Sequence, residues 1–197
     1  MTVVEKGMRV LVVDNYDSFT YNLVHILESL LNDDVTVKRV DQVSTDQLSV
    51  YDAVIFSPGP GLPSESSNLL ALVRESVASG QKILGVCLGH QALAECEGKR
   101  LQNLPEVYHG VSNEMIITSS NSLLYRGIPE KIFTGRYHSW AVDEKSLSSH
   151  WTVTASDEKG LVMSMEHKSK PIFGIQYHPE SVLTPLGSAI LENFLKA

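Results

Sequence analysis

The sequence contains 197 residues, a length that favours one domain over two. Hydrophobic residues make up 43% of the chain and charged residues 20%, which excludes disordered, collagen-like and coiled-coil proteins. No apolar run approaches the roughly 18 residues that span a bilayer, and residues 1–7 lack the basic and apolar regions of a secretory signal. We therefore expect a single domain over residues 1–197 and no membrane partner.

The chain is acidic and poor in cysteine. Its 16 lysine and arginine residues stand against 23 aspartate and glutamate residues, which gives a formal net charge of -7. Because nucleic acid binding requires several cations that neutralise phosphates, we expect no nucleic acid partner. Cys87 and Cys96 are too few for a disulfide scaffold, and together with the missing signal they indicate a cytoplasmic location.

Strand and helix patterns alternate along the chain up to about residue 100. Four short apolar or alternating runs read as strands, at residues 9–13, 35–40, 53–56 and 82–86. Three stretches with apolar residues at helical spacing read as helices, at residues 18–30, 69–79 and 89–97. Ser18 is the expected N-cap of the first helix, and Gly80 ends the second. This order predicts an α/β, flavodoxin-like fold with a mostly parallel sheet and helices on both faces.

The pattern changes after residue 100. Short β-leaning segments follow one another with turns between them, at residues 114–118, 131–137, 151–155, 161–165 and 172–176. We interpret them as a partly antiparallel extension of the same sheet in the C-terminal half. A last helix is expected over residues 186–195.

The sharpest chemical signal is the motif GVCLG at residues 85–89, between a predicted strand and a predicted helix. It is the cysteine form of the nucleophile elbow, a strained turn that lifts its central side chain above the sheet. Glycines flank Cys87 because a Cβ there would clash, and the N-terminal end of the next helix favours a thiolate. The motif therefore favours a nucleophilic Cys87 over a cysteine that packs as a small hydrophobe.

A nucleophilic thiol needs a base, and His178 is the best candidate among the seven histidines. The other six lie in a helix, beside the elbow, among turn residues or in polar, exposed stretches: His25, His90, His109, His138, His150 and His167. An apolar strand runs into His178, and Pro179 holds that residue extended. Residues two apart on extended backbone face the same side, so Glu180 can orient the imidazole. Taken alone, this pattern fits a structural pair equally well.

The run SPGPG at residues 57–61 follows the third predicted strand. A simple turn explains its prolines, but its glycines also let backbone N–H groups approach a ligand closely. Ligands bind at the carboxyl edge of doubly wound sheets, and both this loop and Cys87 leave the sheet at that edge. We therefore expect the loop and Cys87 to be neighbours.

Together, GVCLGHQ at residues 85–91, HPES at residues 178–181 and SPGPG at residues 57–61 resemble the motifs of class I glutamine amidotransferases. The runs DNYDSFTYNL at residues 14–23 and RYHS at residues 136–139 narrow the resemblance. They are similar to the small subunits of anthranilate synthase and of 4-amino-4-deoxychorismate (para-aminobenzoate) synthase. The resemblance extends from about residue 9 to residue 195.

The resemblance implies an enzyme that hydrolyses L-glutamine and supplies ammonia to a chorismate-using synthase. In such enzymes the residue matching Cys87 attacks the side-chain amide, that matching His178 acts as base and then acid, and that matching Glu180 orients the histidine. Water then cleaves the γ-glutamyl thioester, and no metal or organic cofactor is needed. Residues with an implied role in substrate binding or oxyanion stabilisation are Gly59, Pro60, Gly61, Leu88, Gln91, Ser139 and Trp140.

The resemblance implies a partner, a large chorismate-binding synthase subunit, and it also implies that this partner activates the chain. The turn segments around His109 and His138 are candidate contact surfaces. The partner decides whether anthranilate or 4-amino-4-deoxychorismate is made, so this sequence does not encode the choice.

The chain departs from the family pattern at a few positions. Residues 95–98 read ECEG where the subunits usually read AFGG, Val111 replaces a usual lysine, and Trp140 replaces a more common leucine. None of these changes falls on the proposed triad. Cys96 is expected to pack, and Val111 concerns the partner interface.

Two other functions compete with this interpretation. A stand-alone Cys-His-Glu hydrolase that cleaves γ-glutamyl peptides would use the same triad, but the run at residues 14–23 resembles the synthase subunits specifically. A non-catalytic flavodoxin-like module, such as a regulatory receiver, would use Asp14 and Asp52 near strand ends. That function leaves the elbow cysteine unexplained.

Overall fold

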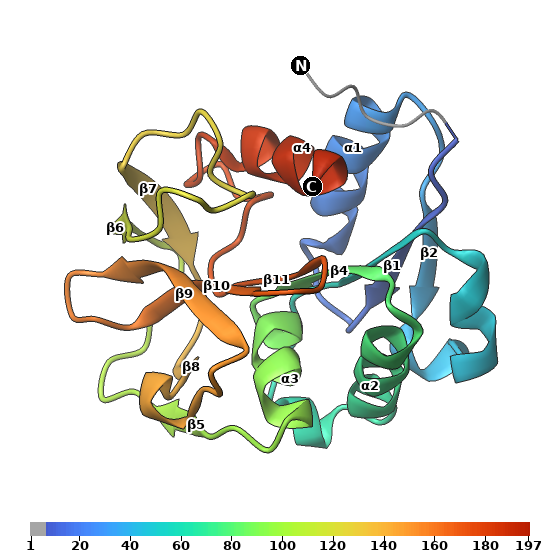
Figure 1. Ribbon diagram of the computed structural model, residues 1–197, viewed down its shortest axis with the longest axis horizontal. Coiled ribbons are helices and arrows are strands. Elements are labelled where there is room, and N and C mark those ends of the chain that lie inside the picture. Colours follow the sequence, from blue (N-terminus) through green and yellow to red (C-terminus); the bar gives the residue numbers. More distant parts are fainter. Residues whose placement is uncertain (1–6) are drawn as a thin grey trace.

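The computed structural model describes residues 7–197 (Figure 1). Residues 1–6 carry most of the segment in which we expect no secretory signal, so that expectation lies outside the described residues. Within residues 7–197, no helix is both long enough and apolar enough to cross a membrane.

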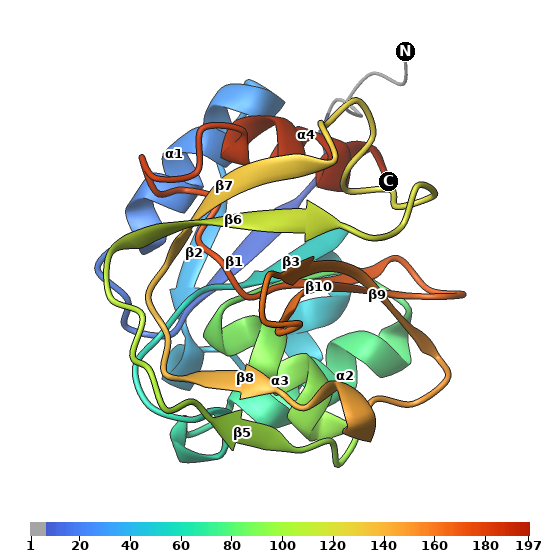
Figure 2. The same cartoon turned by 90° about the vertical axis from the view of Figure 1, so that its left-hand side faces the viewer.

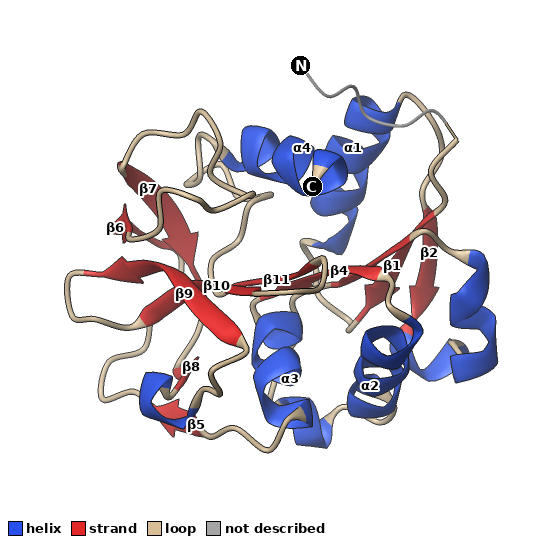
Figure 3. Cartoon of the chain, in the orientation of Figure 1, coloured by secondary structure: helices blue, strands red, loops and turns tan. Residues whose placement is uncertain are grey.

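The elements follow the predicted alternation (Figure 3). The strands are β1 (Val10–Asp14), β2 (Thr36–Arg39), β3 (Ala53–Phe56), β4 (Lys82–Val86), β5 (Leu101–Asn103), β6 (Val111–Ile117), β7 (Lys131–Arg136), β8 (Trp140–Val142), β9 (Trp151–Asp157), β10 (Val162–His167) and β11 (Ile172–Ile175). The α-helices are α1 (Thr20–Leu31), α2 (Leu69–Ser79), α3 (Leu88–Cys96) and α4 (Gly187–Lys196). Short 3-10 helices are η1 (Val40–Gln42), η2 (Thr45–Val50), η3 (Pro63–Glu65) and η4 (Glu144–Ser146).

Across residues 7–197, nine strands form one mixed sheet in the order β2-β1-β3-β4-β11-β10-β9-β6-β7. The strands from β2 to β11 are parallel, and those from β10 to β7 continue the sheet antiparallel (Figure 2). The predicted antiparallel extension is therefore confirmed. Strands β5 and β8, which the sequence did not predict, form a separate antiparallel pair.

Helices cover both faces of the sheet, with α1 and α4 on one side and α2 and α3 on the other (Figure 1). Strand β1 shows how the sequence produces these two layers. Val10 and Val12 belong to the core beneath α1 and α4, whereas Leu11 and Val13 belong to the core beneath α2 and α3. Successive side chains of a strand face opposite sides, so a strand covered on both faces must be apolar throughout. The predicted α/β fold is confirmed.

The start of α1 differs from its prediction. The helix begins at Thr20, its N-cap is Phe19, and no side chain caps it. The Asp17 carboxylate accepts the Phe19 N–H at 2.7 Å, and the Asp14 carboxylate accepts the Thr20 hydroxyl at 2.8 Å. Since these two carboxylates bind the groups near the helix start, the prediction of an N-cap at Ser18 is wrong.

The two acidic residues considered for a receiver do not meet. Asp14 ends β1, whereas Asp52 directly precedes β3 and forms an exposed ion pair with Arg9 at 3.2 Å. Because β1 and β3 are parallel, the length of a strand separates the two carboxyl groups. The structure therefore contradicts an acidic site built from this pair.

Candidate functional site

Cys87 lies at a strained turn between β4 and α3. Its φ is 50° and its ψ is -97°, a conformation that residues with a Cβ rarely adopt. The backbone holds this turn in place, because the Cys87 N–H donates to the Ile175 carbonyl at 2.8 Å and the Cys87 carbonyl accepts the Gln91 N–H at 3.1 Å. Cys87 therefore stands at the carboxyl edge of the sheet and at the N-terminus of α3, as an elbow requires.

The glycines on either side of Cys87 are required by close packing. A Cβ on Gly85 would lie 2.5 Å from the carbonyl of Gly89. A Cβ on Gly89 would lie 2.3 Å from the carbonyl oxygen of Phe56 in β3. Both distances are far below ordinary van der Waals contact. The two glycines thus let α3 begin directly against the sheet.

His178 and Glu180 form a buried pair next to Cys87. His178 Nδ1 lies 2.6 Å from Glu180 Oε1, and the two side chains are 3% and 0% exposed. Burial lowers the pKa of His178, but the neighbouring Cys87 thiol and Glu180 carboxylate outweigh it and hold the pKa well above its usual value. In residues 7–197, His178 Nε2 has no hydrogen-bond partner, which leaves it available for proton exchange with the thiol.

Cys87 borders two cavities. The inner cavity has a volume of about 140 Å³. It is lined by every residue to which the resemblance gives a substrate role, namely Gly59, Pro60, Gly61, Leu88, Gln91, Ser139 and Trp140. The outer cavity, of about 430 Å³, is lined by Cys87 and His178 together with Tyr16, His109 and Tyr137. The expected proximity of the glycine loop and Cys87 is thus present in the structure.

A chain of amide side chains joins the inner cavity to the thiol. Gln91 Nε2 donates to the Trp140 carbonyl at 2.9 Å and to Gln176 Oε1 at 3.1 Å. Gln176 Nε2 in turn donates to Cys87 Sγ at 3.6 Å. Among the described residues nothing donates to Gln91 Oε1, so this oxygen is an unused acceptor beside the cavity. Sequence reasoning missed Gln176, because one amide after an apolar strand forms no motif.

Asn15 and Ser57 hold the glycine loop and were also missed. The Asn15 N–H donates to Ser57 Oγ at 2.9 Å, and Asn15 Nδ2 donates to the Ser57 carbonyl at 2.9 Å. The Ser57 hydroxyl then donates to the Pro58 carbonyl at 2.7 Å. These bonds join the turn after β1 to the turn after β3. Asn15 lies within the run at residues 14–23 that carries the family resemblance, but nothing in the sequence pairs it with Ser57.

Arg136 positions the segment that carries Ser139 and Trp140. Its guanidinium is 1% exposed, donates through Nη1 to Asp157 at 2.7 Å, and donates through Nε to His138 Nε2 at 3.1 Å. Because Nε2 of His138 accepts, Nδ1 carries the proton and donates to the Trp140 carbonyl at 2.8 Å. Burial, aided by Arg136, lowers the pKa of His138 to about 4 and keeps it neutral.

This arrangement leads to a prediction about Asp157. We expect Asp157→Ala to lower the free energy of unfolding by about 3–5 kcal/mol, because it leaves the Arg136 charge buried without its partner. Denaturant titration measures this loss. Glu106→Ala, which removes the exposed partner of Lys159, is the matched control and should cost far less. Similar small losses in both variants would contradict the role given to Asp157.

A second prediction concerns His90, which is fully buried directly after the elbow. Burial, with a smaller effect of His138, lowers the pKa of His90 to about 3 from an ordinary value of 6.5. The neutral form is favoured by folding, so its stabilising contribution is present above pH 6.5 and is lost as the pH falls toward 3. We expect the wild type to lose about 3 kcal/mol of stability through this residue between pH 7 and pH 4.

His90→Gln, measured by urea unfolding at both pH values, should lack this part of the acid dependence. The control is His25→Gln, because the His25 side chain is 74% exposed. An acid dependence that is identical in wild type and His90→Gln would refute the prediction.

The second cysteine has a different environment. Cys96 is half-buried at the end of α3, and its thiol donates to the Leu93 carbonyl at 3.3 Å. Burial, with Glu97 adding to it, raises the pKa of Cys96 to about 11. The protonated thiol is a poor nucleophile, which agrees with the packing role expected for it.

Comparisons with known proteins agree with the geometry. Residues 11–197 match the family described as glutamine amidotransferase class-I. The chain is 41% identical over 189 residues to "Anthranilate synthase component II" of Haloarcula marismortui, covering 94% of this chain and 96% of that protein. It is 36% identical over 189 residues to "Aminodeoxychorismate/anthranilate synthase component 2" of Bacillus subtilis, covering 95% of each. A crystal structure of a glutamine amidotransferase from Thermotoga maritima shares the fold, with a TM-score of 0.83, 16% identity, and coverage of 98% of this chain and 100% of that one.

Proposed function

The chain belongs to the class I glutamine amidotransferase family, and we propose that it is the glutaminase component of an anthranilate or 4-amino-4-deoxychorismate synthase. One observation carries the chemistry. A cysteine at a strained elbow stands beside a buried His178–Glu180 pair and borders a cavity of about 140 Å³.

In the first half-reaction, the Cys87 thiolate attacks the side-chain carbonyl carbon of glutamine and a C–S bond forms. The carbonyl electrons move to the oxygen, where the N–H groups of Leu88 and of the loop at residues 59–61 stabilise the charge. His178 then gives its proton to the amide nitrogen, the C–N bond breaks and ammonia leaves. The raised pKa of His178 supports this role, because the imidazolium is available at neutral pH.

In the second half-reaction, His178 takes a proton from water as the water oxygen attacks the γ-glutamyl thioester. The C–S bond breaks, glutamate is released and the Cys87 thiolate is restored. Glu180 holds the imidazole ring through Nδ1 and stabilises its charged form, so that Nε2 faces the reacting atoms in both steps.

The inner cavity is the proposed binding site for the substrate glutamine. Gln91 Oε1 is an unused acceptor, and we propose that the backbone at Ser139 and Trp140, which line the cavity, binds the amino-acid end of the substrate. Arg136 and His138 fix this backbone through the Trp140 carbonyl. The arrangement supports a substrate that carries both a side-chain amide and a charged α-amino-acid group.

The partner we propose is a chorismate-binding synthase subunit, supported by the word "component" in the names of the relatives. The outer cavity of about 430 Å³ borders Cys87 and is lined by His109 and Tyr16, and we propose it as the route by which ammonia leaves. Tyr16 in the lining of this cavity is 52% exposed, and Val107 and Val111, which flank His109 in the sequence, are 68% and 39% exposed. In the candidate contact segment around His138, the histidine itself is buried in the Arg136 network, whereas Tyr137, Ser139 and Trp140 are partly exposed.

Glutamate release tests the coupling between the chain and its partner. We expect the isolated chain to hydrolyse glutamine slowly and the addition of the large subunit with chorismate to raise the rate at least about tenfold. Docking would favour the conformation in which the donors near Leu88 and the loop at residues 59–61 point at the oxyanion. An isolated chain that already matches the rate of the complex would instead support the stand-alone hydrolase.

The product is tested by growth. The chain would be expressed with each cognate large subunit in strains that require anthranilate or para-aminobenzoate. Restored growth identifies the synthase that the chain serves, and failure with both would contradict the proposed component.

The two free thiols of the chain support a cytoplasmic location for this complex.

A further inference from the structure

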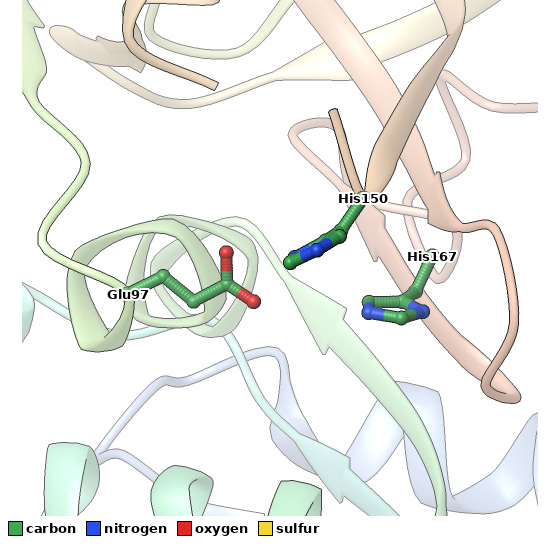
Figure 4. Close-up of side chains that lie close together, drawn as sticks. All are labelled: Glu97, His150 and His167. Carbon is green, nitrogen blue, oxygen red and sulfur yellow. The ribbon is translucent and has the colours of Figure 1, made fainter. Parts of the chain in front are cut away.

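Three side chains that can bind a metal ion gather at the end of α3 that lies away from Cys87 (Figure 4). Glu97 follows the last residue of α3, His150 directly precedes β9, and His167 is the last residue of β10. One ligand atom of each lies within 4.8 Å of those of the other two. The glutaminase reaction uses none of these residues, because α3 places Glu97 about 15 Å along its axis from Cys87.

The Glu97 carboxylate is already oriented. Its Oε2 accepts the indole N–H of Trp151 at 3.0 Å and the hydroxyl of Ser148 at 3.3 Å. Hydrogen bonds of this kind fix a ligating carboxylate and leave its other oxygen for the ion.

The two imidazoles face each other from neighbouring segments. Their ring centroids are 5.9 Å apart, and the Trp151 ring packs against His167 at 5.3 Å. The C-terminal end of α3 adds a partial negative charge beside the cluster.

We propose that Glu97, His150 and His167 form a binding site for a divalent transition-metal ion such as Zn²⁺. Two imidazoles and one carboxylate are an established zinc donor set, and a water completes the tetrahedron. Ligand atoms on such an ion lie about 3.4 Å apart when the metal–ligand bonds are near 2.1 Å. Small side-chain rotations must therefore bring the three ligand atoms closer together than they are in the structure. His150 is exposed and free to make such a rotation. His167 Nδ1 accepts the Ser169 N–H at 3.2 Å. A neutral imidazole that binds the ion through Nε2 carries its proton on Nδ1, so water would then replace this contact.

A metal ion at this site would cross-link α3 to the β9–β10 pair. Its ligands come from the end of a helix and from the β9–β10 pair, in which His167 lies opposite Trp151. A bound ion would join α3 to the antiparallel part of the sheet and stabilise the folded chain by mass action. Metal binding is therefore expected to raise the thermal unfolding midpoint without taking part in glutamine hydrolysis.

The test uses untagged, chelator-treated full-length protein and titrates it with Zn²⁺ in a calorimeter and with Co²⁺ in an absorption spectrometer. Cys87→Ser is the reference, because the active-site thiol and His178 can also bind Zn²⁺. We expect this reference to bind one equivalent of Zn²⁺, to show a Co²⁺ spectrum without thiolate bands, and to unfold at a higher temperature with metal.

Ligand variants are made in the same background. His150→Ala, His167→Ala and Glu97→Gln should each weaken Zn²⁺ binding at least about tenfold and remove the thermal shift. His25→Ala is the matched control, because His25 is exposed and pairs with Glu28 but belongs to no metal-binding cluster among residues 7–197. Zn²⁺ affinity that is unchanged in the ligand variants, or an absence of Zn²⁺ binding in the reference, would overturn the proposal. Far-UV circular dichroism verifies that each variant is folded.

Discussion

Replacing Cys87 with serine is expected to lower glutamine-dependent synthesis by the assembled complex at least about a thousandfold. Ammonia-dependent synthesis by the same complex should stay within about twofold of wild type. The two activities separate because the thiol only liberates ammonia, and a saturating external supply replaces that step. Product formation is measured with each nitrogen source in turn.

Cys96→Ser is the matched control for this experiment. The protonated, hydrogen-bonded Cys96 thiol does not border either cavity at the site, so this variant should keep both activities. A folded Cys87→Ser complex that loses both activities equally would show that Cys87 has a structural role. Strong inactivation of a folded Cys96→Ser variant would show that Cys96 takes part in the chemistry assigned to Cys87.

The second large effect is expected at the His178–Glu180 pair. His178→Ala should lower glutamine turnover at least about a thousandfold, because it removes the buried ring nitrogen beside the Cys87 thiol that Glu180 holds in place. Glu180→Ala should keep about ten to a hundred times more activity than His178→Ala, since the remaining imidazole still samples the productive orientation. Steady-state glutamate release measures both.

Glu180→Gln separates orientation from charge. Its amide oxygen can still accept from Nδ1, but it no longer stabilises the imidazolium, so its activity should lie between that of wild type and that of Glu180→Ala. Wild-type turnover in His178→Ala would leave Cys87 without a base. Equal activity of the Gln and Ala variants would mean that Glu180 acts by charge alone.

The sequence predicted those parts of the fold that depend on local pattern. Strands β3 and β4 match their predicted bounds to the residue, whereas β1, which is also covered on both faces, begins and ends one residue later than predicted. The elbow was predictable because only glycine fits at residues 85 and 89. The contact between His178 and Glu180 was predictable because a spacing of two residues is itself a local geometry.

What was missed depends on contacts between distant residues. Strand β5 is short and largely exposed, and it exists only because Leu101 pairs with Val142 across the chain. Arg136 and Asp157, and likewise Asn15 and Ser57, meet only after the sheet has formed. The cluster of Glu97, His150 and His167 is a further case, since each residue alone reads as an ordinary polar side chain. Patterns within one element cannot report such contacts.

We expect glutamine to react covalently with Cys87, and active-site labelling measures this reaction. The complex is treated with a chloroketone analogue of glutamine, digested, and mapped by mass spectrometry with and without excess L-glutamine. We expect one label per chain, located on Cys87, blocked by glutamine, lost in Cys87→Ser and retained in Cys96→Ser. A label on Cys96, or a label on Cys87 that glutamine does not block, would contradict a covalent reaction of glutamine with Cys87.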